Sequence, residues 1–323
     1  MVKFGIIGAG KIAHKFAKAL LGINEYLYAI ASRDLGRAME FAQIYDIDKY
    51  YGSYDELLSD PEVQCVYIAT PMSEHYQNML DCLNAGKHVI CEKTFTLNHK
   101  EAKIVCNLAK EKGLFLMEAM WTRFLPTIQE VQKIINEGMI GDIVQIESFI
   151  NLRLEFPPES RIFSKELGGG ALLDVGVYPI TMANLFLGIP DSFDTEVKFA
   201  KTGVDAEEKI TFFYPHSNAT LFASVITNDK KDTYIYGTKG YVHIPGFWGT
   251  ETAIVFNNHH KIIKEIEHKH IVNGMEYEIF EAVKCIKKKL IESPIMPHKT
   301  TIDIMRQMDE IRKSWDLVYP TEL

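Results

Sequence analysis

The sequence predicts an α/β fold in two parts, a parallel sheet with crossover helices followed by a part whose strands pair antiparallel. Up to about residue 120, short apolar runs alternate with amphipathic stretches, which is the pattern of parallel strands linked by helices. Between residues 195 and 271, β-rich runs recur without helices between them, as in an antiparallel sheet. Because 323 residues exceed what one hydrophobic core usually organises, we expect two domains, 1–120 and 121–323.

The first domain is expected to hold a sheet of six strands. The expected strands are 3–7, 26–32, 65–69, 88–91 and 115–118, with 49–51 as a weaker sixth. The helices expected between them are 12–21, 36–45, 73–85 and 99–112. Asp60-Pro61 and Gly113 stop elements, and Ser73 is expected to cap the helix that follows it.

The second domain begins with an expected helix, 127–137, which ends at Gly138. A strand is expected at 143–152, and further β-rich runs lie at 210–214, 219–227 and 233–237. The glycine-rich loop 167–170 precedes a helical pattern that Pro179 is expected to kink or delimit. From residue 279 onward the pattern is again helical, with two apolar stripes that we interpret as core packing.

Composition and charge favour a soluble protein of the cytoplasm. The net charge of −8 is the opposite of what a nucleic-acid-binding protein carries, so we expect no nucleic-acid partner. The five cysteines include no C-x-x-C pair and lie mostly among apolar residues, which suits reduced thiols in a cytosol. No apolar run reaches the ~18 residues of a membrane span and no cleavable signal pattern is visible, so no membrane partner is expected.

A G-x-G-x-x-A motif lies at the junction of the first strand and the first helix. Gly8 permits a tight turn, Gly10 lets a pyrophosphate approach the backbone, and Ala13 lets the helix pack closely on the strand. Lys11 and Ile12 open the helix, whose N–H groups attract an anion. The motif therefore predicts a dinucleotide site, and a glycine turn with a purely structural role is the alternative.

The end of the second strand should carry the residue that contacts the adenosine ribose. A site that prefers NAD would usually have an acid there, whereas this chain has Ser32 and Arg33. Ser32 can donate a hydrogen bond and Arg33 can pair with a 2′-phosphate, so NADP is the predicted cofactor, with NAD possible. In the alternative, Arg33 stacks on adenine and Asp34 restores NAD binding. Arg37 is a candidate second cation, and a surface salt bridge is its alternative role.

Two further strand ends supply candidates for the nicotinamide half of the cofactor. Thr70, Pro71 and His75 follow a strand at the carboxyl edge of the sheet, where ligands of open α/β folds bind. For His75, a packed histidine is the alternative. Glu92 and Lys93 end the next strand, where the Lys93 ammonium can hydrogen-bond a substrate oxygen and stabilise negative charge. The alternative for Lys93 is a surface salt bridge with Glu92.

Together, G-x-G-x-x-A, the A-T-P...H segment and Glu92-Lys93 resemble the glucose-fructose oxidoreductase / inositol dehydrogenase / MocA family. Segments 118–124, 161–163, 167–179 and 237–248 are similar to its branch of dimeric dihydrodiol dehydrogenases and NADP-dependent D-xylose dehydrogenases. The resemblance implies an N-terminal Rossmann domain and a C-terminal α/β domain with an open, mostly antiparallel sheet, whose exposed face makes a homodimer. One departure is Thr94, where the family commonly has proline.

The resemblance also implies catalytic roles. Lys93 matches the family's catalytic lysine, Tyr178 matches the tyrosine of this branch, and Asp174 matches the acid one helical turn before it. On a helical pattern, the four-residue separation of Asp174 and Tyr178 puts both on one face. The expected reaction is hydride transfer between nicotinamide C4 and a carbon that bears a hydroxyl, with Tyr178 and Lys93 handling the hydroxyl proton. Substrate contacts are expected from Asp174, Tyr178, Trp121, Arg123, Phe124 and Arg161, with packing as the alternative for Trp121.

Two alternatives to this reaction are open at this stage. An NAD-dependent glycosidase of the same superfamily would show no net redox change, and a nucleotide-binding regulator would show no turnover. Histidines gather late in the chain, at His259-His260 and at His268 and His270, but no third ligand or H-E-x-x-H motif accompanies them, so no metal site is expected. Aldose sugars, trans-dihydrodiols and vicinal dicarbonyls all fit as small-molecule substrates.

Overall fold

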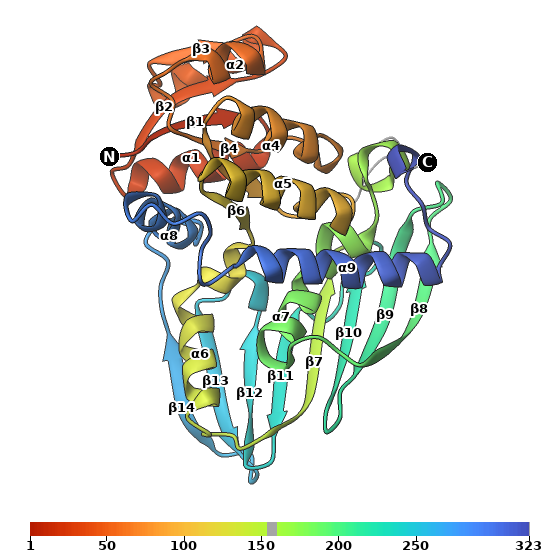
Figure 1. The fold of residues 1–323 in the computed structure, drawn as a ribbon. Helices are drawn as coiled ribbons and strands as arrows, with labels where there is room; N and C mark the ends of the chain where they lie inside the picture. Colours follow the sequence, from red (N-terminus) through yellow and green to blue (C-terminus); the bar gives the residue numbers. More distant parts are fainter. Residues whose placement is uncertain (154–159, 323) are drawn as a thin grey trace. The chain divides into compact units, whose positions relative to one another are not determined.

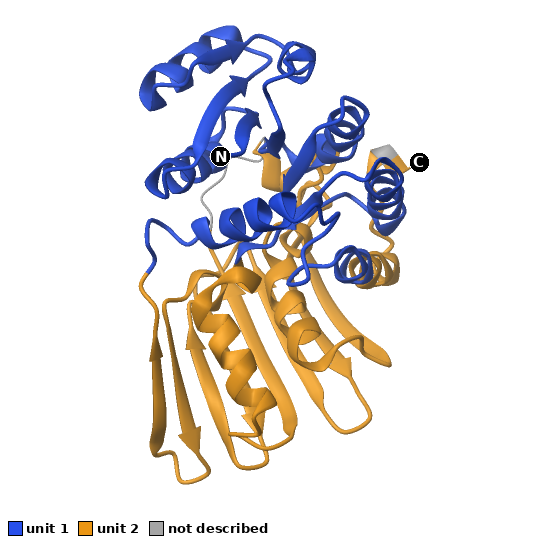
Figure 2. Ribbon diagram, turned by 60° about the vertical axis from the view of Figure 1, so that its left-hand side comes forward, with its two compact units in different colours: residues 1–121, 270–305 blue, residues 122–269, 306–323 orange. Residues whose placement is uncertain are grey.

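The computed structural model describes residues 1–153 and 160–322, which form two compact units (Figure 2). The first unit comprises residues 1–121 and 270–305, and the second comprises 122–269 and the chain from 306 onward. Segment 270–305, which the sequence grouped with the second domain, packs on the first unit. There Val272 lies against Gly22, and the Asn273 side chain donates a hydrogen bond to the Lys15 carbonyl at 2.9 Å.

Six parallel strands form the sheet of the first unit, in the order β3-β2-β1-β4-β5-β6 (Figure 1). The strands are β1 (Lys3–Ile7), β2 (Tyr26–Ala31), β3 (Lys49–Tyr51), β4 (Cys65–Ile68), β5 (His88–Glu92) and β6 (Leu116–Ala119). All six expected strands are confirmed, with ends displaced by at most one residue. The order reverses between β1 and β4, and in open α/β sheets ligands bind at the carboxyl ends of the strands at such a point.

The expected helices of the first unit are also present. They are α1 (Lys11–Gly22), α2 (Leu35–Tyr45), α4 (His75–Asn84) and α5 (His99–Lys112), joined by α8 (Glu276–Lys287) from the later segment. The short α3 (Tyr54–Ser59) was not predicted, because six residues are too few to show a helical period. Its start is set by Ser53, whose hydroxyl accepts the Glu56 N–H at 3.3 Å.

The prediction that Ser73 caps a helix is wrong. Ser73 lies inside a 3-10 turn, Met72–Glu74, and α4 begins only at His75 without a side-chain cap. The Ser73 hydroxyl is buried and has no hydrogen-bond partner among the described residues. Pro71 has an extended backbone and precedes the 3-10 turn. The turn includes Ser73, so that Glu74 and not Ser73 stands directly before α4.

Eight strands form the sheet of the second unit, in the order β14-β13-β12-β11-β7-β10-β9-β8 (Figure 1). Neighbours are antiparallel except β7 and β10, which are parallel. The prediction of a parallel sheet followed by a mostly antiparallel one is therefore confirmed. The strands are β7 (Ile143–Asn151), β8 (Ser192–Phe199), β9 (Asp205–Phe213), β10 (Asn218–Ser224), β11 (Asp232–Gly237), β12 (Gly240–Pro245), β13 (Thr252–Asn257) and β14 (Ile262–Glu267).

Helices α6 (Pro126–Asn136) and α7 (Val177–Leu187) cover one face of this sheet (Figure 1). α7 continues directly from a π-helical turn, Leu172–Gly176, and Pro179 is its third residue. Because helical backbone precedes Pro179 from Ala171 onward, Pro179 does not delimit this segment, and the expected kink stays a prediction.

One helical stretch bears on the expectation that no apolar run reaches the length of a membrane span. Residues Lys165–Leu187 form a 23-residue stretch that is long and apolar enough to cross a membrane, judged by length and composition alone. It includes the 3-10 turn Lys165–Leu167, the glycine-rich loop 168–170, and the π-helical turn Leu172–Gly176 that leads directly into α7. Of its most apolar window, 72% is buried inside the structure, as in the core helix of a folded domain.

Candidate active site

The first glycine of the motif is required by the fold of the first unit itself. Gly8 follows β1 with a positive φ of +95°, and its N–H donates to the Ala31 carbonyl at 2.9 Å. A Cβ at this position would lie 2.8 Å from the Ala69 carbonyl oxygen. Both the backbone conformation and the close approach of the loop after β4 therefore exclude a side chain here.

The second glycine has no such internal reason. Gly10 precedes α1 with an ordinary φ of −92°, and a Cβ there would meet only the Ala69 carbonyl oxygen, at 3.9 Å. No side chain caps α1, and no acidic residue lies in its first turn, which Lys11 and Ile12 open. Ala13 is fully buried, as close packing of helix on strand requires. The open space before an uncapped helix N-terminus fits the pyrophosphate of a dinucleotide.

This contrast between the two glycines gives a first prediction. Gly10→Ala should leave the free energy of unfolding unchanged while weakening dinucleotide binding by about tenfold or more, because it obstructs bonds to the phosphates. Gly8→Ala should weaken binding and also lower the free energy of unfolding by about 1–3 kcal/mol. Denaturant unfolding and cofactor titration measure the two effects. Equal losses of stability in both variants would contradict the assignment of Gly10 to the ligand.

At the end of β2, the acid that could have served the ribose is engaged elsewhere. Asp34 caps α2, where its Oδ1 accepts the Arg37 N–H at 3.2 Å. Ser32 is buried, and its hydroxyl accepts the Asp34 N–H at 3.3 Å. The Arg37 guanidinium donates to the Ala9 carbonyl of the glycine loop at 2.9 Å, so this cation lies against the predicted phosphate site. Arg33 is exposed beside them.

Tyr54, at the start of α3, belongs to the same region and was missed by sequence reasoning. Burial raises the pKa of its phenol, while the positive charges of Arg33 and Arg37 lower it. Two guanidinium groups and a phenol therefore lie within electrostatic reach of one another next to the glycine loop. α3 is too short to be predicted, so no pattern in the sequence pointed to Tyr54.

His75 joins two of the strand-end loops. Its Nδ1 lies 2.9 Å from the Thr94 carbonyl oxygen and its Nε2 lies 3.0 Å from the Thr70 carbonyl oxygen. The ring is buried, which agrees with the packed-histidine alternative. Thr70 also accepts a hydrogen bond from Asn78 on its hydroxyl, and Pro71 follows it before the 3-10 turn. His75 thus holds the loops after β4 and β5 together at the carboxyl edge of the sheet.

The backbone before Lys93 is anchored by a buried carboxyl. Glu92 accepts the Lys93 N–H on Oε2 at 3.2 Å, and the Tyr67 hydroxyl donates to its Oε1. Burial raises the pKa of Glu92, while the Tyr67 hydrogen bond and the positive charges of Lys93 and Lys15 lower it. The peptide bond between Lys93 and Thr94 is cis. Lys93 itself is half-buried at the end of β5.

A second buried acid, Glu278 of α8, lies within electrostatic reach of Glu92. Glu278 is fully buried, and neither of its carboxyl oxygens has a hydrogen-bond partner among the described residues. Burial raises the pKa of Glu278 well above its usual value, and the nearby carboxylates of Glu92 and Glu276 raise it further. Tyr67 of β4 stacks on Phe16 of α1 with ring centroids 3.6 Å apart. Glu278 could not be predicted for this site, because it lies far along the chain from Glu92.

In the second unit, the structure brings Asp174 together with Arg161. The Arg161 Nη2 donates to Asp174 Oδ1 at 2.8 Å, and the Asp174 side chain is only 12% exposed. Asp174 lies in the π-helical turn and Tyr178 in the first turn of α7, so the segment is not one uniform α-helix. The prediction that both share one face rests on α-helical spacing, and it stays a prediction because Asp174 lies in a π-helical turn. Tyr178 is buried in this unit.

The remaining substrate candidates lie in or next to a 3-10 turn, Trp121–Phe124. Within the first unit, the Trp121 ring packs on Gly274, where a Cβ would lie 2.8 Å from the ring. This contact agrees with the packing alternative for Trp121. In the second unit, Arg123 and Phe124 are buried, and the Arg123 carbonyl accepts a hydrogen bond from Gln129 at 2.6 Å. Their contact with a substrate stays a prediction.

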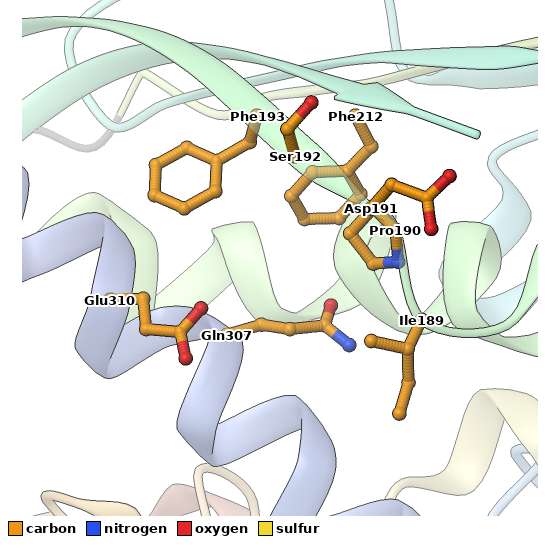
Figure 3. A pocket seen from close by; sticks show the side chains of 8 residues that line it. All are labelled: Ile189, Pro190, Asp191, Ser192, Phe193, Phe212, Gln307 and Glu310. Atoms are coloured by element: carbon orange, nitrogen blue, oxygen red, sulfur yellow. The ribbon is translucent and has the colours of Figure 1, made fainter. Parts of the chain in front are cut away.

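A surface pocket of about 270 Å³ in the second unit contains none of the predicted site residues (Figure 3). Its lining comes from the loop before β8, from β8 and β9, and from α9 (His298–Ser314). The lining residues are Ile189, Pro190, Asp191, Ser192, Phe193, Phe212, Gln307 and Glu310. We assign this pocket no part in the reaction.

The late histidines do not converge. β14 ends at Glu267, so His268 and His270 lie beyond the strand, and His268 Nε2 is 2.6 Å from Glu130 Oε2. Among residues 1–153 and 160–322, no three His, Cys, Asp or Glu side chains are grouped so that they could hold a metal ion.

Comparisons with known proteins agree with the geometry of both units. A family model described as "Oxidoreductase family, NAD-binding Rossmann fold" matches residues 2–120, and the GFO/IDH/MocA C-terminal domain matches residues 128–243. The trans-1,2-dihydrobenzene-1,2-diol dehydrogenases of Mus musculus and Homo sapiens are each 32% identical to this chain, and each alignment covers 99% of both proteins.

Solved structures share the fold at lower identity. A 3-ketoreductase from Actinomadura kijaniata, in complex with NADP and TDP-benzene, superposes with a TM-score of 0.87 at 24% identity over 97% of both chains. An aldose-aldose oxidoreductase from Caulobacter crescentus, complexed with glycerol, superposes with a TM-score of 0.88 at 20% identity over 97% of both chains. The full-length relatives and the two matching family models establish that the chain belongs to the GFO/IDH/MocA family of oxidoreductases, with an NAD-binding Rossmann domain at its N-terminus.

Proposed function

We propose that this protein is an NADP-dependent dehydrogenase or reductase that acts on a CH–OH group of a sugar, a diol or a related dicarbonyl compound. The observation that carries the proposal is Lys93 at the carboxyl end of β5, with its backbone N–H held by the buried Glu92 carboxyl. In this family a lysine at that position is expected at the nicotinamide. Relatives named for dihydrodiol oxidation and solved structures named for sugar oxidoreduction support the substrate class.

Two features of the first unit support NADP as the cofactor. Arg33 and Arg37 both lie within electrostatic reach of Tyr54, and Arg37 donates to the glycine loop. Asp34, which would favour NAD, accepts the N–H of Arg37 as the cap of α2. Guanidinium groups pair with phosphate through charge-assisted hydrogen bonds, and Arg33 is the group that we assign to the 2′-phosphate.

The assignment of Arg33 gives a second prediction. Arg33→Ala should raise the Kd of NADP by about 10–100-fold, as expected for the loss of a charge-assisted hydrogen bond, and leave the Kd of NAD almost unchanged. Lys18→Ala, which removes an exposed positive charge from α1 of the same unit, is the matched control and should change neither Kd. Fluorescence titration with both cofactors measures the difference. Equal weakening of NADP and NAD by Arg33→Ala would remove the phosphate assignment.

The proposed chemistry divides between side chains of the two units. When bound, the nicotinamide supplies or accepts the hydride at C4. Lys93 and Tyr178 hold and move the proton of the substrate hydroxyl, and either can be the immediate acid/base while the other tunes it. The Arg161–Asp174 pair, joined at 2.8 Å, orients the substrate beside Tyr178. The Lys93 ammonium also stabilises negative charge on the oxygen as the hydroxyl becomes a carbonyl.

A substrate panel tests the proposed function. Aldose sugars, trans-dihydrodiols and vicinal dicarbonyls are each incubated with the protein and with NADP, NADPH, NAD or NADH, and the near-ultraviolet absorbance of the reduced nicotinamide is followed. We expect net reduction or oxidation of the cofactor by at least one class, faster with the phosphorylated form. Tight NADP binding without net redox change across the panel would contradict the proposal and favour a glycosidase or a regulator.

We also propose that the protein is a cytoplasmic homodimer. On β11, β12 and β13, side chains on one face are buried while aromatic rings line the other. Tyr234 stacks on His243 at 4.4 Å and Tyr241 stacks on Phe256 at 4.7 Å. Such an aromatic face favours a protein partner, and the five buried, unpaired cysteines suit a reducing compartment. Sedimentation velocity tests the dimer, and a monomer at micromolar concentration would contradict it.

A further inference from the structure

Two buried carboxyl groups lie behind the segment that carries Asp174 and Tyr178. Both come from β9, where Asp205 is fully buried and Glu208 is only 1% exposed. Neither residue belongs to the site described above, and neither is joined to a lysine or arginine by an ion pair among those found in the described part of the chain. Burying a carboxyl group costs free energy unless the group is hydrogen-bonded or paired.

Asp205 is placed at the start of the π-helical turn. Its Oδ2 accepts the N–H of Leu172, the first residue of that turn, at 2.5 Å. Gly170 precedes the turn with φ +135°, and a Cβ there would overlap Asp205 Oδ1. Burial raises the pKa of Asp205 to about 6, against the opposing effects of the backbone N–H bonds and the charge of Arg312. A carboxylate at this point satisfies a helix N–H that has no partner inside the helix and favours the helix dipole.

Glu208 contacts the other end of the same turn. A Cβ on Gly176, the last residue of the turn, would lie 2.5 Å from Glu208 Oε1. Neither Glu208 oxygen has a hydrogen-bond partner among the described residues. Burial raises the pKa of Glu208 well above its usual value, and the carboxyls of Asp205 and Glu207 raise it further. Glu208 therefore fills the space left by Gly176.

The two carboxyls thus bracket the turn that bears Asp174. Asp205 fixes its first residue and Glu208 packs on its last, while Asp174 in the middle accepts from Arg161. Two glycines of the segment 170–176 are explained by these contacts, since each gives room to one carboxyl. In an α-helix, residues four apart lie about 40° apart around the axis, whereas a π turn changes that angle. The direction of Asp174 relative to Tyr178 therefore depends on the turn being held.

We propose that Asp205 and Glu208 are positioning residues of the active site, which hold the π-helical turn so that Asp174 and Tyr178 present their side chains to one substrate. The activity readout of this inference rests on the proposed function, whereas the contacts themselves do not. The effect is mechanical, because a displacement of a catalytic group by about 1 Å can cost about 100-fold in rate. Neither carboxyl touches substrate or cofactor in this scheme.

The first test compares carboxyls on one strand. Asp205→Ala should lower kcat/KM by about 100-fold, and Asp205→Asn should recover most of that loss, because its amide oxygen still accepts the Leu172 N–H. Glu207→Gln is the matched control. Glu207 is also buried on β9, but its carboxyl accepts from Ser224 at 3.2 Å and from Lys198 instead of the turn. If Asp205→Ala lowers kcat/KM no more than Glu207→Gln, or if Asn rescues nothing, the positioning role is wrong.

The second test is a pair of compensating changes. Gly176→Ala should reduce kcat/KM because the new methyl group meets Glu208 Oε1, and the double variant Gly176→Ala/Glu208→Asp should regain activity because the shorter side chain withdraws its oxygen. All assays are run well below the thermal midpoint of each variant, so that the folded population is the same. A double variant as slow as Gly176→Ala alone would show that Glu208 does not act on the turn.

A readout independent of turnover separates this inference from the proposed function. In hydrogen exchange followed by mass spectrometry, peptides covering 170–178 should exchange faster in Asp205→Ala and Gly176→Ala than in wild type, with peptides of the first unit and NADP affinity unchanged. Glu207→Gln should leave 170–178 protected. If the wild type turns over no substrate but this pattern is found, the proposed function fails and the positioning contacts stand. Unchanged exchange in Asp205→Ala would overturn the inference.

Discussion

Lys93→Met is expected to lower kcat by about 10²–10⁴-fold, the range that a positioned acid/base contributes, while the Kd of NADP stays nearly unchanged. Methionine keeps the length and the apolar stem of the side chain but has no N–H to hydrogen-bond a substrate oxygen and no charge to stabilise it. The Glu92 contact that anchors this residue uses the backbone N–H, which the substitution retains. Steady-state kinetics and NADP titration on the same preparation measure the two effects.

Lys100→Met is the matched control for this variant. Lys100 is exposed in the first turn of α5, and its replacement should change neither kcat nor NADP affinity. Near-normal turnover by Lys93→Met would refute the catalytic role of Lys93. A loss of NADP affinity as large as the loss of kcat would instead assign this lysine to cofactor binding.

Tyr178→Phe is expected to have the second largest effect, a decrease in kcat of about 10²–10⁴-fold with a smaller change in KM. The substitution removes only the hydroxyl, because the buried ring keeps its place in the first turn of α7. Interactions made only in the transition state lower kcat and kcat/KM together when they are removed. Kinetics with the best substrate of the panel measure the change.

The control is the same substitution elsewhere in the second unit. Tyr214→Phe removes a hydroxyl that donates to the Gly188 carbonyl at 3.3 Å, outside the predicted site. It should cost about 0.5–1.5 kcal/mol of stability and leave kcat unchanged. If Tyr178→Phe retains full turnover while Lys93→Met does not, lysine acts as the acid/base without the tyrosine.

The parallel sheet was predictable because its strands are buried on both faces and appear as continuous apolar runs. The ends of β1 and β4 are correct to a residue for that reason. The placement of segment 270–305 was not predictable, because it depends on contacts such as Asn273 with Lys15, which are far apart in sequence. α3 escaped detection because a single helical turn or two shows no period.

The residues of the candidate site also fall into those that local sequence patterns predict and those that depend on long-range contacts. Gly8, Gly10 and Lys93 could be predicted from local patterns. The two glycines lie in the turn between a strand and the start of a helix, and Lys93 follows the end of a strand. Tyr54, Glu278 and Asp205 could not be predicted in this way, because their roles come from long-range burial against other elements. The π turn that carries Asp174 was not predictable for a similar reason, since its first N–H is bound by Asp205 of β9, a contact that no spacing within 170–178 reveals.

The most direct test of the central claim is a crystal structure of the protein with NADP and a substrate from the panel. The measurement is the distance from the Lys93 ammonium and from the Tyr178 hydroxyl to the substrate oxygen next to nicotinamide C4. We expect both groups within hydrogen-bond reach of that oxygen, about 2.6–3.2 Å. A structure in which either group points away from the nicotinamide, or lies too far from the oxygen to exchange a proton with it, would contradict the proposed enzyme.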